Sequence, residues 1–224
     1  MEPIEQQAMS PAVIQKIQDR KVIAVLVIQE ITDAIPLAKA LAAGGVDLIE
    51  LTLRTPIALD AAKLIMEEVP EITVGLGTVL TVGQVKAAAE IGVAFAVAPG
   101  CNPRIISAAK EYGLSFAPGV TTPTDIEMAL EQGCRVMKYF PSETSGGMKH
   151  LRSMAAPYQY LGLSFIPLGG VNQANAESYL SSPLISAIGG SWIAKSPLIQ
   201  AQDWGRITEN ARSIRSLITK INTQ

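Results

Sequence analysis

TVGLGTVLTVGQVKAAAEIG, residues 73–92, contains one complete strand-and-helix unit of this chain. Its first part, residues 73–79, is short and mostly apolar, which is typical of a buried strand. Residues 83–91 are rich in alanine, which favours a helix, and Gly92 follows where a helix C-terminus prefers glycine. The stretch therefore predicts a strand followed by a helical crossover, the building unit of a parallel α/β sheet.

The same unit recurs along the chain at intervals of roughly twenty to thirty residues. Strands are expected at residues 22–28, 48–53, 73–79, 95–98, 114–118, 135–140, 164–168 and 185–188. Helices are expected between them, with glycine at several C-termini and a cap followed by proline at Thr55-Pro56, Asn102-Pro103 and Thr122-Pro123. Eight units favour a (β/α)₈ TIM barrel over an open doubly wound sheet, whose Gly-x-Gly-x-x-Gly fingerprint is missing after the first strand.

The N-terminal part precedes the first strand. Residues 12–21 are expected to form an extra helix that covers the barrel floor, and residues 1–10 to form a loose tail. No internal linker is visible, so residues 1–224 are expected to fold as a single domain.

Composition and charge exclude several classes of protein. Apolar residues make up 48% of the chain and charged residues 17%, which fits a compact core and argues against disorder. A net charge of −2 gives no excess of positive charge with which to bind nucleic acid or an anionic membrane. No apolar run is long enough to span a bilayer. The acidic, polar N-terminus does not resemble a secretory signal, so the simplest location is the cytoplasm.

Few side chains are suited to metal or redox chemistry. Cys101 and Cys134 have no metal or redox spacing. The single histidine, His150, argues against a Ser-His-Asp triad and against a zinc site built on several histidines. His150 itself is expected on the solvated part of a helix, without a catalytic role.

The strand at residues 48–53 carries charged residues on one face. Side chains alternate along a strand, so Glu50, Thr52 and Arg54 share a face opposite to the apolar residues between them. The apolar face suits the helix layer, which turns the polar face into the barrel. A carboxylate and a guanidinium there are costly unless paired or used. Two interpretations remain: a Glu50–Arg54 ion pair at the barrel mouth, or a general acid–base beside a carboxylate clamp.

Lys138 stands in an apolar strand, VMKYFP at residues 136–141. Burial disfavours the charged form of a lysine, and a neutral amine can attack a carbonyl to form a Schiff base. The same alternation points Lys138 into the barrel with Val136 and Phe140, toward Glu50 on the opposite side. The alternative is a lysine whose ammonium reaches out to water from the strand end.

Glycine-rich segments follow the strands at residues 164–168 and 185–188. Gly169-Gly170 and Gly189-Gly190-Ser191 lie there, in the loops that commonly bind phosphate in this fold through backbone N–H groups. Each glycine pair alone also serves a tight turn, but their joint placement indicates a phosphorylated substrate.

From about Lys21 to Ile214 the chain resembles the bacterial class I 2-keto-3-deoxy-6-phosphogluconate (KDPG) aldolases, which often also act as 4-hydroxy-2-oxoglutarate (KHG) aldolases. The resemblance rests on five motifs in a specific order: ELTLRT at 50–55, GTVL at 77–80, APG at 98–100, KYFP at 138–141 and GGSW at 189–192. It implies a homotrimeric (β/α)₈ lyase without metal or organic cofactor. Such an enzyme cleaves a keto-acid phosphate to pyruvate and glyceraldehyde 3-phosphate.

The resemblance also implies a role for each site residue. Lys138 matches the Schiff-base lysine and Glu50 the acid–base. The residues matching the pyruvyl end are Arg54, Thr78, Pro99 and Phe140, and those matching the phosphate site are Gly169, Gly170, Gly190 and Ser191. Leu168 departs from the family's usual Ser or Thr, which leaves open the C4 configuration and the choice between phosphorylated and dicarboxylic substrates.

Three other functions are alternatives to a Schiff-base aldolase. A sugar-phosphate isomerase or epimerase would bind phosphate without an adduct at Lys138. An inactive metabolite-binding barrel fits poorly with the joint presence of Lys138, Glu50, Arg54 and Thr78. A metal-dependent aldolase is the least favoured, because few metal-binding side chains follow the strands.

Overall fold

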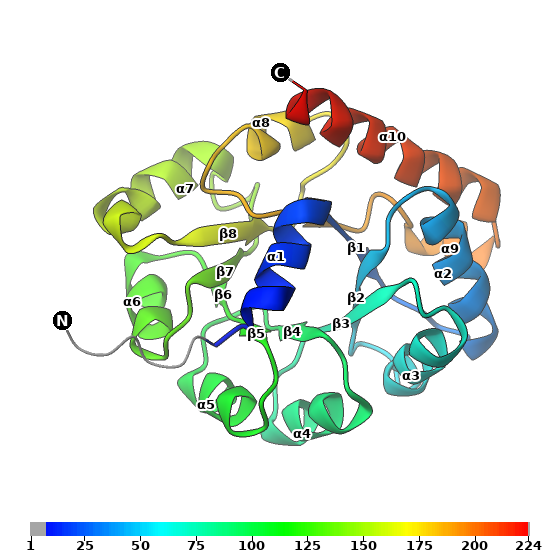
Figure 1. The fold of residues 1–224 in the computed structure, drawn as a ribbon, viewed down its shortest axis with the longest axis horizontal. Coiled ribbons are helices and arrows are strands. Elements are labelled where there is room, and N and C mark those ends of the chain that lie inside the picture. Colours follow the sequence, from blue (N-terminus) through cyan, green and yellow to red (C-terminus); the bar gives the residue numbers. More distant parts are fainter. Residues whose placement is uncertain (1–7, 224) are drawn as a thin grey trace.

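The computed structural model describes residues 8–223, in which helices surround a curled parallel sheet (Figure 1). The strands are β1 (Val22–Leu26), β2 (Leu48–Thr52), β3 (Thr73–Gly77), β4 (Phe95–Val97), β5 (Phe116–Ala117), β6 (Gly119–Val120), β7 (Val136–Tyr139), β8 (Ser164–Pro167) and β9 (Ile188–Gly190). The α-helices are α1 (Pro11–Arg20), α2 (Ala34–Ala43), α3 (Ala58–Glu68), α4 (Val82–Ile91), α5 (Pro103–Glu111), α6 (Pro123–Glu131), α7 (Gly147–Ala155), α8 (Ala176–Leu180), α9 (Ser196–Gln200) and α10 (Trp204–Asn222). Two 3₁₀ helices, η1 (Ile31–Asp33) and η2 (Ala156–Leu161), complete the described part.

The sheet has two sections whose strands all pair in parallel. Six strands follow the order β5-β4-β3-β2-β1-β9, and three follow the order β6-β7-β8. Parallel pairing throughout agrees with the alternation of strands and helices in the sequence.

The fifth predicted strand, residues 114–118, is divided in the structure. Pro118 separates β5, which pairs with β4, from β6, which pairs with β7. Proline has no N–H to donate, but its carbonyl accepts a bond of 2.8 Å from the Lys138 N–H. The proline therefore stands at the point where the chain passes from one section of the sheet to the other.

Two predicted boundaries are wrong. The last strand was expected at residues 185–188, but β9 begins at Ile188, because Ile188, Gly189 and Gly190 pair with β1. Thr55-Pro56 does not open α3, whose N-cap is Ile57. Asn102 and Thr122 do cap α5 and α6 through their side chains, as expected.

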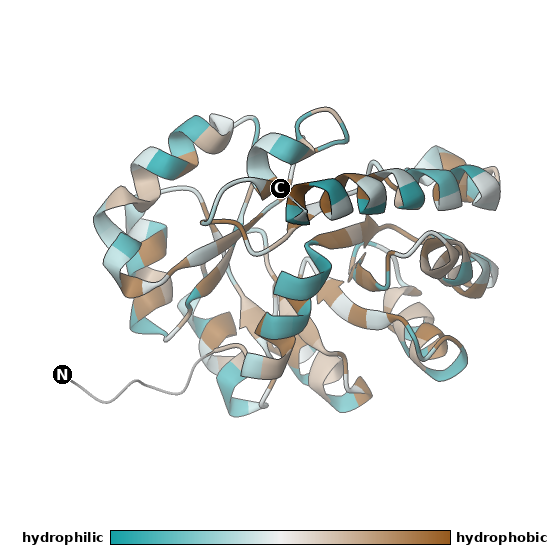
Figure 2. Cartoon of the chain, turned by 45° about the horizontal axis from the view of Figure 1, so that its top comes forward, coloured by the Kyte–Doolittle hydropathy of each residue, from teal (hydrophilic) through white to brown (hydrophobic). Residues whose placement is uncertain are grey.

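Apolar side chains form an outer and an inner core. The outer core fills the space between sheet and helices, and Figure 2 shows brown and teal alternating along α10 at its edge. The buried residues of α10, Ile207, Ala211, Ile214 and Ile218, repeat every three or four positions as one apolar stripe. A separate inner core contains Leu48, Phe95, Val136, Ile166 and their neighbours. Because the two cores lie on opposite faces of the sheet, successive residues of a strand are buried in turn in the outer and in the inner core.

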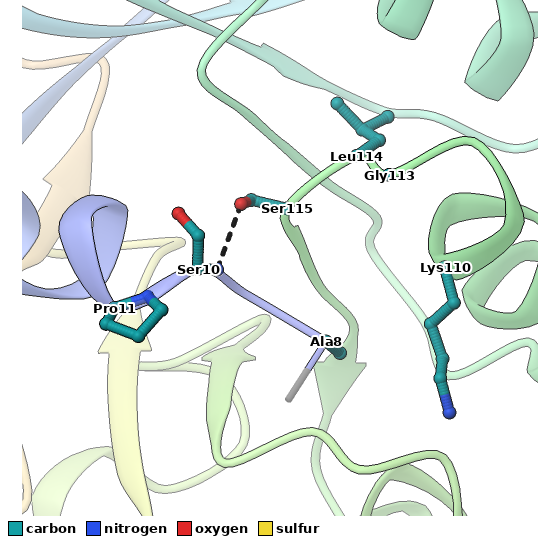
Figure 3. Close-up of a pocket in the computed structure, with 7 residues that line it drawn as sticks. All are labelled: Ala8, Ser10, Pro11, Lys110, Gly113, Leu114 and Ser115. Atoms are coloured by element: carbon teal, nitrogen blue, oxygen red, sulfur yellow. Dashed lines mark hydrogen bonds between the residues drawn. The ribbon is translucent and has the colours of Figure 1, made fainter. Parts of the chain in front are cut away.

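The N-terminal segment closes one end of the inner core. The Ala8 carbonyl accepts a bond from the Phe116 N–H, and Met9 is 2% exposed within the inner core. Ile17 of α1 joins the same core, and Figure 1 shows α1 across the middle of the curled sheet. Figure 3 shows the adjoining pocket, in which the Ser10 N–H donates to the Ser115 hydroxyl at 3.1 Å. The prediction of a loose tail is therefore wrong for residues 8–10, and residues 1–7 lie outside the described residues.

None of the helices within residues 8–223 combines the length and apolar character needed to cross a membrane.

Candidate active site

Lys138 and Glu50 form a buried pair across the inside of the sheet. Lys138 stands on β7 and Glu50 on β2, and Lys138 Nζ lies 2.9 Å from Glu50 Oε1. Their side chains are only 6% and 2% exposed. A buried pair is strongly coupled, since removing either partner leaves the other without compensation. The amine and the carboxylate are therefore placed to exchange a proton directly.

Strand alternation places both side chains as the sequence predicted. Leu48 and Val136, two positions before Glu50 and Lys138, belong to the inner core. Ile49 and Met137, one position before them, belong to the outer core. Both charged side chains thus point inward, and the alternative in which Lys138 extends to solvent is wrong.

Gly77 makes room for the Glu50 carboxylate. A Cβ atom at residue 77 would stand 2.0 Å from Glu50 Oε1, far inside van der Waals contact. Gly77 pairs with Thr52 on the neighbouring strand and so lies directly beside the carboxylate. Glycine is needed here for space and not for backbone freedom.

Arg54 lies apart from Glu50 and contacts Thr78 instead. Its Nε donates to Thr78 Oγ1 at 3.4 Å, and the guanidinium is exposed at the rim of the site. Within residues 8–223 Arg54 forms no salt bridge, so the predicted Glu50–Arg54 ion pair is wrong. Thr78 has a φ of 60°, which is uncommon for a residue other than glycine.

A cavity of about 530 Å³ opens in front of Lys138. The predicted residues that line it are Glu50, Arg54, Lys138, Phe140, Leu168, Gly169, Gly190 and Ser191. The Phe140 ring lies beside the amine, 5.4 Å from Nζ to the ring centroid. Thr78, Pro99 and Gly170 lie outside the lining, although Thr78 contacts Arg54.

Five further residues line the cavity that the sequence reasoning did not select: Val25, Val27, Lys195, Ser196 and Pro197. The two valines follow from the alternation along β1, a signal that was present in the sequence. Lys195 follows the last strand, but nothing in its neighbours marks it as part of a site.

Backbone bonds join the loops after β7 and β8. The Ser142 N–H donates to the Leu168 carbonyl at 2.7 Å, and the Glu143 N–H donates to the Gly169 carbonyl at 2.9 Å. Gly169 and Gly170 have φ values of 92° and 87°, which side chains rarely tolerate. A Cβ at residue 170 would also lie 2.6 Å from the Glu143 Cβ. The turn at the far end of the cavity is therefore held against the loop that follows Lys138.

Tyr179 of α8 stabilises the contact between the loops after β7 and β8. Its hydroxyl donates to Glu143 Oε1 and lies 2.7 Å from the Ser142 Oγ. Burial raises the pKa of Tyr179, and the bond to Glu143 raises it further. Tyr179 therefore stays a hydrogen-bond donor at neutral pH and links α8 to both loops.

His150 contacts Tyr139, a contact that the sequence reasoning missed. Its Nδ1 lies 3.0 Å from the Tyr139 hydroxyl, and the two rings stack with centroids 6.0 Å apart. Burial raises the pKa of Tyr139 to about 12, with a smaller contribution from the charge of Glu143. The expectation that His150 is simply solvated is wrong, since its ring packs on the strand that carries Lys138.

The two glycines of β9 approach their neighbours closely. A Cβ at Gly189 would lie 2.7 Å from the Leu168 Cγ, and one at Gly190 would lie 2.1 Å from the Trp192 ring. These glycines provide space, which lets Leu168 fold over β9 at the edge of the cavity. Leu168 is 4% exposed and belongs to the inner core.

Cys101 and Cys134 are free thiols away from this cavity. Burial is the main cause that raises the pKa of Cys101 to about 11 and that of Cys134 to about 12. A thiol attacks as the thiolate, so neither cysteine is suited to nucleophilic catalysis at neutral pH. Residues 8–223 contain no group of three or more His, Cys, Asp or Glu arranged for a metal ion.

Comparisons with known proteins match most of the length of this chain. The family model for KDPG and KHG aldolase matches residues 13–210. A KHG/KDPG aldolase of Escherichia coli (strain K12) is 40% identical over 191 residues, which cover 85% of this chain and 89% of that protein. A 2-dehydro-3-deoxy-phosphogluconate aldolase of Haemophilus influenzae is 37% identical over 206 residues, covering 92% and 96%.

A solved structure has the same fold. It is a KDPG aldolase from Legionella pneumophila, with pyruvate captured as a covalent carbinolamine intermediate. Its TM-score is 0.85 and its identity 35%, with 90% of this chain and 97% of that chain covered. The matches span most of the chain and confirm the resemblance inferred from its motifs. The chain belongs to the KDPG and KHG aldolase family.

Proposed function

We propose that this chain is a Schiff-base aldolase that cleaves 2-dehydro-3-deoxy-6-phosphogluconate to pyruvate and glyceraldehyde 3-phosphate. The observation that carries the proposal is the buried pair of Lys138 and Glu50, 2.9 Å apart, at the wall of an open cavity. A second reaction of the same kind would cleave 4-hydroxy-2-oxoglutarate to pyruvate and glyoxylate. Both substrates present a 2-keto acid to the same lysine.

The reaction begins when Lys138 gives a proton to Glu50 and its free amine adds to the C2 carbonyl. Glu50 then returns that proton to the C2 hydroxyl of the carbinolamine, the oxygen leaves as water, and the carbinolamine becomes an iminium while Glu50 is again a carboxylate. Glu50 takes the proton of the C4 hydroxyl, and the C3–C4 bonding electrons move into the iminium, which becomes an enamine while C4 leaves as the aldehyde. Protonation of the enamine at C3 and hydrolysis then release pyruvate and restore the amine.

The remaining residues hold the two ends of the substrate. Arg54 and Thr78 would bind the pyruvyl carboxylate, and their mutual hydrogen bond supports a shared role. Phe140 and Pro99 would pack around the pyruvyl carbons. Gly169, Gly170, Gly190 and Ser191 would bind the distal phosphate through backbone N–H groups and a hydroxyl. Fixing both ends keeps the C2 carbonyl in front of Lys138.

Leu168 supplies an apolar wall between the two ends of the substrate. Its side chain lies against Gly189 and lines the cavity without offering a hydroxyl. The C4 configuration and the balance between the two substrates are therefore set by shape at this position.

The proposal also covers the closure of the sheet, the oligomeric state and the location of the enzyme. The bridge between Phe165 and Ile185, beside β9, supports a sheet that closes into one (β/α)₈ barrel. A homotrimer is expected from the family, and the exposed side chains of Leu80 and Val82 near Thr78 offer an apolar contact surface. A cytoplasmic location stays a prediction, and the two free thiols agree with a reducing compartment.

Trapping with pyruvate tests the reaction type. The protein is incubated with pyruvate, reduced with borohydride and digested, and the peptides are analysed by mass spectrometry. A reduced pyruvyl adduct on Lys138 is expected. An adduct on another lysine, or none, would overturn the mechanism, and retained phosphate binding without an adduct would favour an isomerase or epimerase.

A further inference from the structure

The cavity has an uneven distribution of positive charge. Arg54 and Lys138 lie toward the end proposed for the pyruvyl group, and Lys138 is paired with Glu50. Lys195 is the third basic residue in the lining, together with Gly169, Gly190 and Ser191. Lys195 follows Ser191 by four residues in the chain, and among the described lining residues it is the one basic residue to which no role at the pyruvyl end is assigned.

Lys195 is exposed and carries no ion pair within residues 8–223. Most other ionic contacts in this part of the chain join surface groups of the same helix, such as Lys63 with Glu67 and Arg206 with Glu209. An ammonium at the wall of a cavity without a carboxylate partner is free to bind an anion that enters.

The groups at the end proposed for the phosphate offer hydrogen bonds but no net charge. A phosphate ester carries a charge of about −1.5 to −2 at pH 7. Backbone N–H groups and the Ser191 hydroxyl can donate to its oxygens, whereas a hydrogen bond from an ammonium is both shorter and stronger. A dianion at this end therefore lacks a counter-charge unless Lys195 supplies it.

We propose that Lys195 binds the phosphate of the substrate and determines the preference of the enzyme for a phosphorylated keto acid. The inference rests on the proposed aldolase function, because it assigns a residue to the distal end of that substrate. Lys195 contacts no reacting atom in this scheme, so its contribution appears in substrate binding.

Steady-state kinetics of Lys195→Gln test the proposal, with Lys39→Gln as the matched control. Lys39 is an exposed lysine of α2 that does not line the cavity, and its substitution removes the same charge. Each variant is assayed with the six-carbon keto-acid phosphate and with the same acid lacking its phosphate. Lys195→Gln is expected to raise KM for the phosphorylated acid about tenfold and to lower the preference for it equally. Lys195→Arg should restore most of that preference.

Salt and a direct probe complete the experiment. The difference between wild type and Lys195→Gln should shrink at high ionic strength, because salt screens an exposed charge. Binding of inorganic phosphate, followed by phosphorus NMR, should weaken in Lys195→Gln and not in Lys39→Gln.

Two results would overturn the assignment: an unchanged substrate preference in Lys195→Gln, or phosphate binding equal to that of wild type. If wild type formed no pyruvate adduct, the aldolase proposal would fail instead. The phosphate measurement would still decide the role of Lys195 in that case.

Discussion

At one end of the cavity Lys138 and Glu50 meet through side chains that stand on strands, whereas at the other end the backbone of Gly169, in the turn after β8, and of Gly190, the last residue of β9, lines the wall. The end with Lys138 and Glu50 lies on strands that are buried on both faces of the sheet, and its geometry follows from strand pairing. The second end depends on contacts between loops, made by Ser142 and Glu143. Substitutions at the pyruvyl end should therefore stop chemistry, whereas those at the distal end should change which substrate is bound.

The largest effect is expected from Lys138→Met. Without the amine no iminium forms, so kcat should fall by about 10⁴-fold or more, in the range found for lost nucleophiles. The matched variant Lys39→Met should keep full activity and still give the borohydride-reduced adduct. Substantial turnover in Lys138→Met would show that the covalent step is absent.

The same variant also tests the burial of the pair. Lys138→Met leaves Glu50 buried without its cation, which should cost about 3 kcal/mol of unfolding free energy. The double variant Lys138→Met, Glu50→Gln removes that charge and should regain part of the loss. Urea titrations of the wild type, both single variants and the double variant give the coupling energy. A coupling near zero would mean that the pair is not formed in solution.

Gly77→Ala should impair catalysis without touching a reactive group. The added Cβ would lie 2.0 Å from Glu50 Oε1 and must displace the carboxylate. A displacement of about 1 Å can lower the rate about 10²-fold. Gly83→Ala is the control, because a Cβ at this position of α4 meets only Thr81 Oγ1, at 3.9 Å. Equal kcat values for the two variants would show that the rate does not depend on the position of the Glu50 carboxylate.

The pyruvyl end could be predicted from the sequence because the direction of each side chain depends only on its immediate neighbours in the strand. Side chains alternate along β2 and β7, and the apolar residues beside Glu50 and Lys138 fix which face meets the helices. Two charged residues in separate apolar strands then had to share the interior. The motifs around them also carried the family resemblance.

The distal end could be predicted only in outline. The glycines after β8 and at the end of β9 indicated a phosphate site, but the contact of Glu143 with Tyr179 joins residues far apart in the sequence. The same holds for Lys195, which shares the cavity with Gly169 only after the sheet has curled. The division at Pro118 was also missed, because it depends on which neighbour each half of the strand pairs with.

Leu168→Thr should change substrate choice more than rate. A hydroxyl at this position can bond to a substrate hydroxyl near C4, and we expect the ratio of kcat/KM between the two substrates to shift about tenfold. The ratio is measured with KDPG and with 4-hydroxy-2-oxoglutarate in wild type and variant. Leu168→Met is the control, since it keeps an apolar side chain of similar volume. Equal ratios in wild type and Leu168→Thr would show that Leu168 does not set the preference.

The smallest effect is expected from Tyr179→Phe, which tests whether the distal end relies on contacts outside the cavity. The variant keeps the ring and removes the hydroxyl that bonds to Glu143 and Ser142. The loss of a bond worth about 1 kcal/mol should raise KM for the phosphorylated substrate about fivefold, because the loop bearing Gly169 and Gly170 loses support.

The outcome separates a positioning role from a general structural one. Pyruvate has no distal phosphate, so the rate of imine formation at Lys138 should stay within about twofold of wild type. Tyr158→Phe is the control, since this surface tyrosine also bonds to a glutamate, Glu127, away from the cavity. If Tyr179→Phe slowed imine formation by the same factor as it raised KM, the pyruvyl end and the distal end of the cavity would be structurally coupled. A change confined to KM would mean that strands hold the amine while the α8 contact holds the phosphate loop.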